Sequence, residues 1–153
     1  WTRLRRPGAA DTSVTGISGS NIIGVGIYDD GSHRWTKAFL YDSIIWTTLN
    51  YPGATTYVHG NDTIASGIDG SNIVGRYYDE YSNLHGFLYD GSNWITLDHP
   101  GSSETWTMGI DGSNIVGYYS GGTVSNHGFI YTIPEPCTLL LLGLGAAVLR
   151  RKR

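Results

Sequence analysis

Few side chains in this 153-residue sequence have the type and spacing needed for chemistry. Five histidines could bind a metal ion, but His33, His59 and His99 have no partner at i,i+2 or i,i+4 and no acid at the spacing of a metalloenzyme. His85 and His127 stand at the same place in two copies of a repeat, which favours a structural position near a strand end. We therefore expect no metal site and no cofactor.

Acidic residues recur in patterns that could also do chemistry. The tetrad Asp-Gly-Ser-Asn at 69–72 and 111–114 offers oxygen ligands, yet it lacks the alternating acids and downstream bidentate acid of a calcium loop. Asp-Gly is typical of tight hairpin turns, so we predict turns there. The sequence has no nucleophile elbow, phosphate loop or catalytic carboxylate pair, and we expect no catalytic residue and no enzyme activity. A fragment of a propeller enzyme, with its site gathered from several blades, is the weaker alternative.

The large aromatic side chains divide by whether they follow the repeat. Those in register are predicted to pack between repeat units: Trp1, Trp46, Trp94, Phe39, Phe87 and Phe129. Trp35 and Trp106 are out of register. Because flat rings beside polar side chains can stack on sugar faces, these two residues are candidate glycan contacts, with partial burial as the alternative.

Composition narrows the class of protein. The chain has 22 Gly, 11 Tyr and 5 Trp but only 15% charged residues, which favours short strands separated by turns. A single Cys excludes an intrachain disulfide and a cysteine-based zinc site. The formal net charge is −3 although the last four residues are all basic, so the remainder is more acidic still. This balance argues against nucleic acid as a partner.

An internal repeat organises residues 1–132. Nine-residue blocks at 16–24, 67–75 and 109–117 share the pattern Gly-Ile-x-Gly-Ser-Asn-Ile-Ile/Val-Gly, and aromatic blocks at 38–42, 86–90 and 128–132 follow them. Trp1, Trp46 and Trp94 each precede a Pro-Gly pair by the same spacing. Cut at these tryptophans, the repeat domain has the units 1–45, 46–93 and 94–132.

Each unit is predicted to form four short strands. In the third copy they are 94–97, 105–110, 114–119 and 127–131, and their nearly continuous apolar character indicates a sheet covered on both faces. A unit this small buries its apolar side chains only by stacking on its neighbours. We therefore predict an all-β fold of about three propeller-blade-like repeats, with a β-solenoid or sandwich as the alternative.

The recurring blocks resemble the HAF family of extracellular repeats over nearly all of residues 1–132, except that Lys37-Ala38 replaces the His-Gly of the other two copies. Three blades do not close a ring, since propellers have four to eight. The propeller is therefore expected to be incomplete or open. Either further blades upstream or self-association of chains would cover its ends, or the repeats form an open, curved stack. The chain begins at Trp1 and shows no secretory leader, so we expect it to be incomplete at its N-terminus.

Three segments follow the repeats. Residues 133–138 contain Pro134, Glu135 and Pro136, whose prolines favour an extended stretch. Residues 139–149 are predicted to form a short hydrophobic helix that enters the membrane through Leu139, Leu140, Leu141, Leu142, Leu144 and Leu149. The basic tail 150–153 (Arg150, Arg151, Lys152 and Arg153) would remain in the cytoplasm by the positive-inside rule.

This order of features resembles the PEP-CTERM sorting signal of Gram-negative bacteria, with Cys137 where Ser is usual. The resemblance implies export, transient anchoring in the inner membrane, recognition by an exosortase, and delivery to the cell envelope or the exopolysaccharide matrix. A plain C-terminal tail anchor is the alternative. We expect a structural or adhesive surface protein, or else a module that binds exopolysaccharide.

Overall fold

The structure, a computed structural model, describes residues 1–54, 63–121 and 124–134. Within these ranges all the regular structure is β, and no helix occurs. The strands are β1 Asp11–Ser18, β2 Asn21–Asp29, β3 Arg34–Tyr41, β4 Trp46–Leu49, β5 Thr63–Asp69, β6 Asn72–Tyr78, β7 Leu84–Tyr89, β8 Trp94–Leu97, β9 Glu104–Asp111, β10 Asn114–Gly121 and β11 Val124–Thr132. The predicted all-β class is confirmed, whereas the predicted C-terminal helix lies outside the described residues.

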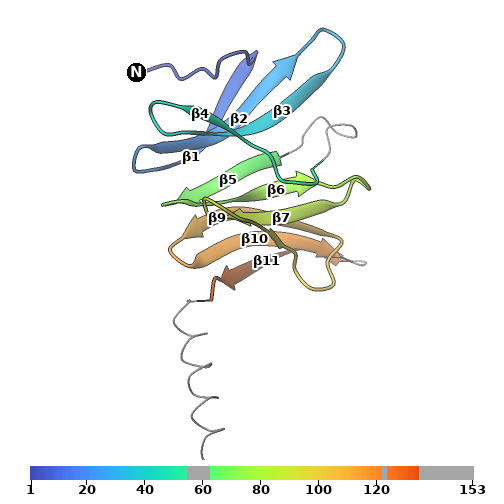
Figure 1. Cartoon of the computed structure of the whole chain (residues 1–153). Coiled ribbons are helices and arrows are strands. Elements are labelled where there is room, and N and C mark those ends of the chain that lie inside the picture. Colours follow the sequence, from blue (N-terminus) through green and yellow to red (C-terminus); the bar gives the residue numbers. More distant parts are fainter. Residues whose placement is uncertain (55–62, 122–123, 135–153) are drawn as a thin grey trace, which may run out of the picture.

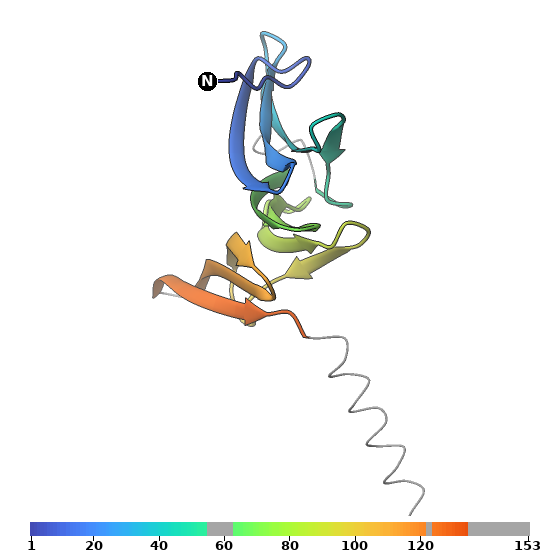
Figure 2. The same ribbon diagram turned by 90° about the vertical axis from the view of Figure 1, so that its left-hand side faces the viewer.

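The strands form three antiparallel sheets in the order β1-β2-β3-β4, β5-β6-β7-β8 and β9-β10-β11. The sheets lie one on another, with the chain's N-terminus at one end of the stack and β11 at the other (Figures 1 and 2). Threonine hydroxyl groups tie neighbouring sheets together: Thr15 Oγ1 donates to the Ala65 carbonyl, and the buried Thr107 Oγ1 donates to the Gly75 carbonyl. Four strands were predicted in the third copy, and all four are present as β8 to β11.

The sheets do not coincide with units cut at the tryptophans. Trp46 and Trp94 begin β4 and β8, which are the last strands of the first and second sheets. The boundaries of the units 1–45, 46–93 and 94–132 therefore separate β4 from the first sheet, which spans 11–49, and β8 from the second, which spans 63–97. The third sheet, 104–132, lies within the last unit. The reason is the tight turn before each tryptophan: the Asp42 carboxylate accepts hydrogen bonds from the amides of Ile44 and Ile45, which directs β4 back onto β3.

The nine-residue block forms the same hairpin in every sheet. Gly70 and Gly112 adopt positive φ angles of 58° and 56° in the turns, as the Asp-Gly dipeptides predicted. The first strand of each hairpin has a one-residue bulge before the turn, and it places Gly24, Gly75 and Gly117 against a carbonyl of that strand. At Gly75, a Cβ atom would lie 2.0 Å from the Ile64 oxygen, so only glycine fits.

Two apolar clusters fill the spaces between the sheets. The first includes Ile23 and Ala38 from one sheet and Ile73 and Phe87 from the next. The second joins Val74 and Leu88 to Ile115 of the third sheet. Each unit thus buries its apolar side chains against its neighbour, as its small size predicted.

Trp46 and Trp94 have matching surroundings. Trp46 meets the Phe39 ring edge-on with ring centres 4.9 Å apart, and Trp94 meets Phe87 at 5.1 Å. Each tryptophan also contacts the tyrosine that follows its phenylalanine by two residues, Tyr41 or Tyr89. Trp1 departs from the prediction that it packs between units, because it is fully exposed and lies outside every sheet.

Candidate functional site

A hydrogen bond from a backbone amide to a threonine hydroxyl is repeated where the chain enters each sheet. The amides of Arg6, Tyr51 and His99 donate to the hydroxyls of Thr12, Thr63 and Thr105 at 2.9, 2.9 and 3.0 Å. Each of these donors stands one residue before a Pro-Gly pair. The connecting segment is thereby fixed, and it carries a different side chain into each of three equivalent sites.

In the first site, the Arg6 side chain is buried. Its guanidinium donates to the Ala38 carbonyl at 3.2 Å and to the Thr48 hydroxyl, and it lies 5.4 Å from the centre of the Phe39 ring. Gly26 leaves room for it, because a Cβ there would be 2.9 Å from Arg6 Cδ. This site therefore holds a cation over aromatic rings.

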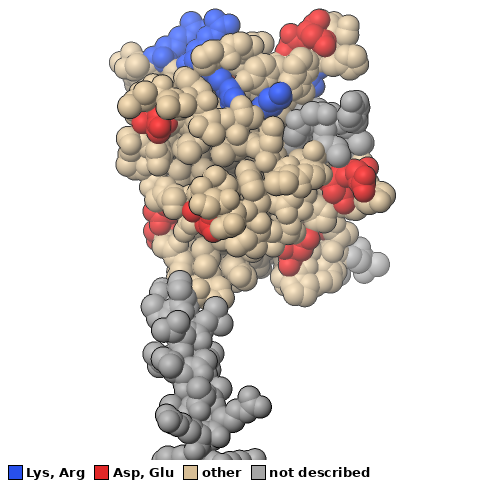
Figure 3. Space-filling view, viewed as in Figure 1, with Lys and Arg blue, Asp and Glu red and all other residues tan. Residues whose placement is uncertain are grey.

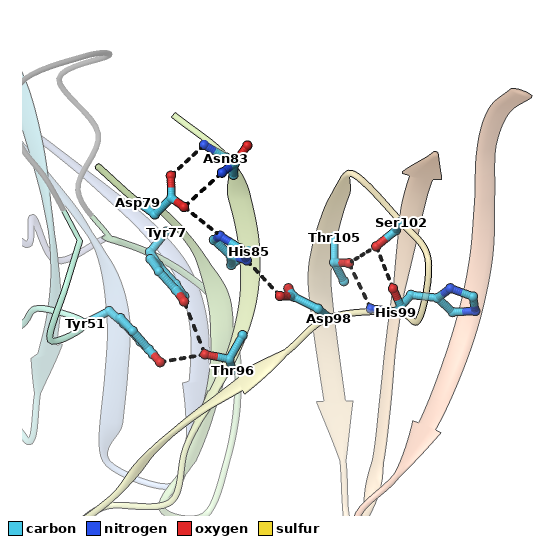
Figure 4. Close-up of polar contacts among 10 residues, drawn as sticks. All are labelled: Tyr51, Tyr77, Asp79, Asn83, His85, Thr96, Asp98, His99, Ser102 and Thr105. Carbon is cyan, nitrogen blue, oxygen red and sulfur yellow. Dashed lines mark hydrogen bonds and ion pairs between the residues drawn. The ribbon is translucent and has the colours of Figure 1, made fainter. Parts of the chain in front are cut away.

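In the second site, Tyr51 stacks on Tyr77 with ring centres 3.7 Å apart (Figure 4). Both hydroxyls reach Thr96 Oγ1, at 2.6 Å from Tyr51 and 3.2 Å from Tyr77. Burial raises the pKa of the Tyr77 hydroxyl well above its usual value. Tyr77 therefore stays protonated at physiological pH and does not act as a base.

His85 lies beside this pair, between two carboxylates (Figure 4). Nδ1 is 2.8 Å from an oxygen of Asp98, and Nε2 is 3.3 Å from an oxygen of Asp79. Burial alone would lower the pKa of His85, but hydrogen bonds to Asp98 and Asp79 raise it above its usual value. Partial burial also opposes ionisation of Asp79, whereas hydrogen bonds from Asn83 and His85 hold its pKa below the usual range.

These three groups do not converge on one point, because the carboxylates contact opposite nitrogens of the ring. The imidazole bridges the loop after β6 and the end of β8, and the two carboxylates favour its protonated form. No group of three or more metal-ligating side chains is found among the described residues.

The bridge predicts a pH dependence of stability. The folded-state pKa of His85 is raised, so its stabilisation is present below the unfolded pKa of about 6.5 and is lost as pH rises through the folded pKa. We expect the free energy of unfolding to fall by about 1 kcal/mol between pH 6 and pH 9, a modest value because the carboxylates are partly exposed. Chemical denaturation across this range measures it.

His85→Gln should remove that slope. His127→Gln is the matched control, because His127 stands at the equivalent place in β11, where its ring faces Tyr119 at 5.5 Å. An unchanged slope in His85→Gln would show that the two carboxylates do not hold the proton.

The remaining predicted residues are dispersed. Trp35 lies in β3, half-buried and stacked on Tyr28 at 6.0 Å. Trp106 lies in β9, half-buried and stacked on Tyr118 at 4.7 Å. The two candidate glycan contacts therefore belong to different sheets and do not form one platform.

The histidines and the Asp-Gly-Ser-Asn tetrads are also separated. His33 lies in the β2–β3 turn, 3.8 Å from Asp30, and His99 stacks on Tyr119 at 3.5 Å, whereas His59 is outside the described residues. The Asp69 carboxylate of the first tetrad accepts a hydrogen bond from the Gly112 amide at 2.7 Å. Each tetrad is thus a turn, and Asp69 ties its turn to the next sheet.

Sequence reasoning missed the three equivalent sites. Part of their signal was present, because Arg6, Tyr51 and His99 share a place before Pro-Gly. Thr12 and Thr105 also share a spacing after it, whereas Thr63 comes six residues later in its copy. The chemical differences among these side chains concealed the common position.

These contacts define an all-β protein in which each repeated sheet holds the segment that leads into it at an equivalent site. Its residues 132–153 match the PEP-CTERM protein-sorting motif. The motif supports export of the chain and its processing by an exosortase, with delivery to the cell envelope or extracellular space. No curated protein and no solved structure matches the chain.

The sorting motif begins where the described sheets end, since β11 finishes at Thr132. Pro134 is the last described residue; Glu135, Pro136, the leucine-rich segment 139–149 and the basic tail 150–153 lie beyond it. In the part of the chain that the structure describes, no helix is long and apolar enough to cross a membrane.

Proposed function

We propose that this protein is a non-catalytic structural or adhesive component of the bacterial cell envelope or extracellular matrix. The observation that carries the proposal is the direct succession of a stacked β-repeat array and a sorting motif at 132–153. Export places the array outside the inner membrane, and its three sheets offer edges and loops for binding.

The repeats are proposed to be propeller-like blades of the HAF type. The recurring sequence blocks support this, as do the four-stranded antiparallel meanders of the first two sheets. In this proposal the segment 139–149 anchors the chain in the inner membrane until an exosortase acts near Pro134, Glu135 and Pro136.

Sorting is tested by Glu135→Ala. We expect the variant to remain uncleaved in the inner membrane, because the Pro-Glu-Pro segment loses the side chain that an exosortase would recognise. Cell fractionation and immunoblotting of the full chain measure release, with Glu104→Ala in β9 as the control. Normal release of Glu135→Ala would refute exosortase processing.

A second candidate function is binding of exopolysaccharide. Trp35 and Trp106 favour it, because each is half-buried and stacked on a tyrosine, which leaves part of a rigid aromatic pair accessible. Loss of one ring contact is expected to cost about 1 kcal/mol, or roughly fivefold in affinity.

Affinity electrophoresis in matrix polysaccharide tests this candidate. Trp35→Ala and Trp106→Ala should each weaken retention, whereas Tyr81→Ala, at an exposed residue in the β6–β7 loop, should not. Retention of both tryptophan variants at the native level would exclude these rings as sugar contacts.

A further inference from the structure

A groove of about 570 Å³ lies between the second and third sheets, beside β11. Its walls are residues 95–100, from β8 and the segment after it, and residues 129–131 of β11. The Ile133 amide donates to the Ser113 carbonyl at 2.8 Å, so the chain runs on past the point where the first two sheets turn back to form β4 and β8. The groove has the size of sites that hold small molecules.

One wall of the groove is aromatic. Phe129 and Tyr131 stand where Phe87 and Tyr89 stand in the second sheet. There the two rings hold the Trp94 indole, with ring centres 5.1 and 4.6 Å from it. In the third sheet Phe129 is half-buried and Tyr131 is 40% exposed, and both line the groove. This wall therefore suits a flat group with an apolar face, about the size of an indole.

The other wall carries hydrogen-bonding groups. Thr96, Asp98 and His99 follow one another along β8 and the segment after it (Figure 4), and all three line the groove. One oxygen of the Asp98 carboxylate bonds to His85 at 2.8 Å. Because a carboxylate accepts several hydrogen bonds, Asp98 can also accept one from a hydroxyl group in the groove.

His99 lacks the partner that its counterparts have. Arg6 and Tyr51 occupy the equivalent sites of the first two sheets, and each reaches a threonine hydroxyl, that of Thr48 or Thr96. The Nδ1 atom of His99 is buried and has no hydrogen-bond partner in the described part of the chain. Buried polar atoms in proteins are nearly always hydrogen-bonded. A hydroxyl group of a ligand would therefore take the place of the threonine hydroxyl.

Charge selects among ligands of this shape. Asp98 is the only Asp, Glu, Lys or Arg among the described residues that line the groove. Lys and Arg gather at the N-terminal end of the stack (Figure 3), and the sequence has neither from residue 77 to residue 149. An anionic ligand would meet the Asp98 carboxylate with no lysine or arginine to offset the repulsion. The groove therefore favours a neutral ligand.

We propose that this groove binds one pyranose ring of a neutral saccharide. The apolar face of the sugar ring lies against Phe129 and Tyr131, and its hydroxyl groups bond to Asp98 and His99.

A pyranose ring unites two features that neighbouring residues supply in the second sheet. Trp94 brings a flat apolar surface to Phe87, and Thr96 brings a hydroxyl group to Tyr51. The proposal rests on the second candidate function, binding of exopolysaccharide. It places the sugar in a groove between two sheets, apart from the two tryptophans named as candidate contacts above.

Titration followed by nuclear magnetic resonance tests the site. The isotope-labelled full chain, in a zwitterionic detergent that contains no sugar, is titrated with cellotetraose, mannotetraose and galactotetraose as neutral probes. We expect at least one of them to shift the amide signals of residues 95–100 and 129–131. Tetragalacturonate, an acidic probe of the same length, should bind about tenfold more weakly because of the Asp98 carboxylate.

Two variants test the contacts. Tyr131→Ala removes one ring, and His99→Phe removes the nitrogens but keeps a flat ring to stack on Tyr119. Each should weaken binding of the neutral probe about fivefold. Tyr81→Ala, at a 75% exposed tyrosine in the β6–β7 loop, should bind as the native chain does. The amide spectra of the same samples show that the variants are folded.

Native affinity in both Tyr131→Ala and His99→Phe would overturn the proposal, and so would equal binding of the acidic probe. Shifts confined to the surroundings of Trp35 and Trp106 would also overturn it, but would leave the second candidate function standing. Shifts of the groove amides that depend on protein concentration without sugar would show that a second copy occupies the groove, against the proposal. No shift with any neutral probe would overturn it, and failure of matrix polysaccharide to retain the native chain would refute the second candidate function as well.

Discussion

Gly75→Ala is expected to destabilise the protein by about 3 kcal/mol or more, because the added methyl group meets backbone and not a movable side chain. The new Cβ would lie 2.0 Å from the Ile64 carbonyl oxygen and 2.9 Å from the Phe87 ring. The Ile64 oxygen belongs to β5, which is paired with β6 immediately beside the bulge. Chemical denaturation of the full chain measures the loss.

Gly128→Ala is the control for this prediction. Gly128 also lies within a strand, but the nearest heavy atom to its Cβ would be 3.8 Å away. We expect a change within about 0.5 kcal/mol. If the two variants were equally unstable, the close approach at Gly75 could not be the cause.

Phe87→Ala should lower the free energy of unfolding by about 3–5 kcal/mol. The side chain is completely buried and contacts Trp94 edge-on, and its removal leaves a cavity between the first and second sheets. The denaturation midpoint should fall while the dependence on denaturant stays constant, because the variant unfolds from the same fold.

Phe129→Ala provides the comparison within the repeat. Phe129 has the same place in β11, but it is only half-buried, and among the described residues no strand pairs with the outer edge of β11. We expect about half the loss of Phe87→Ala, because less apolar surface is buried at Phe129. Equal losses would mean that β8, which carries Trp94, contributes nothing to the energetic effect of burying Phe87.

Much of the fold follows from local patterns. Asp-Gly dipeptides predicted the turns at Gly70 and Gly112, and the in-register Trp46 and Trp94 predicted matching aromatic contacts. These patterns could not show which strand begins each sheet, because a tandem repeat has the same period from any starting residue. Pairing of the Trp46 strand with β3 depends on the short turn at Asp42.

Long-range polar contacts were beyond the sequence patterns. His85 meets Asp98 across thirteen residues because β7 and β8 bring them side by side, and Asp79 reaches the same ring from the loop after β6. The position of His85 was predictable from the repeat, but its two partners were not, since the other copies carry different residues there. The roles proposed for Glu135 and for the leucine-rich segment remain predictions.

The turn-to-turn hydrogen bonds have a consequence for how this gene can change. Ser18 receives the Gly70 amide, and Asp69 receives the Gly112 amide, so each junction between sheets uses the same backbone group of the incoming turn. Unequal recombination that inserts or deletes one whole copy recreates an existing junction. Homologous genes can therefore differ in array length by whole units while the ancestral contacts persist.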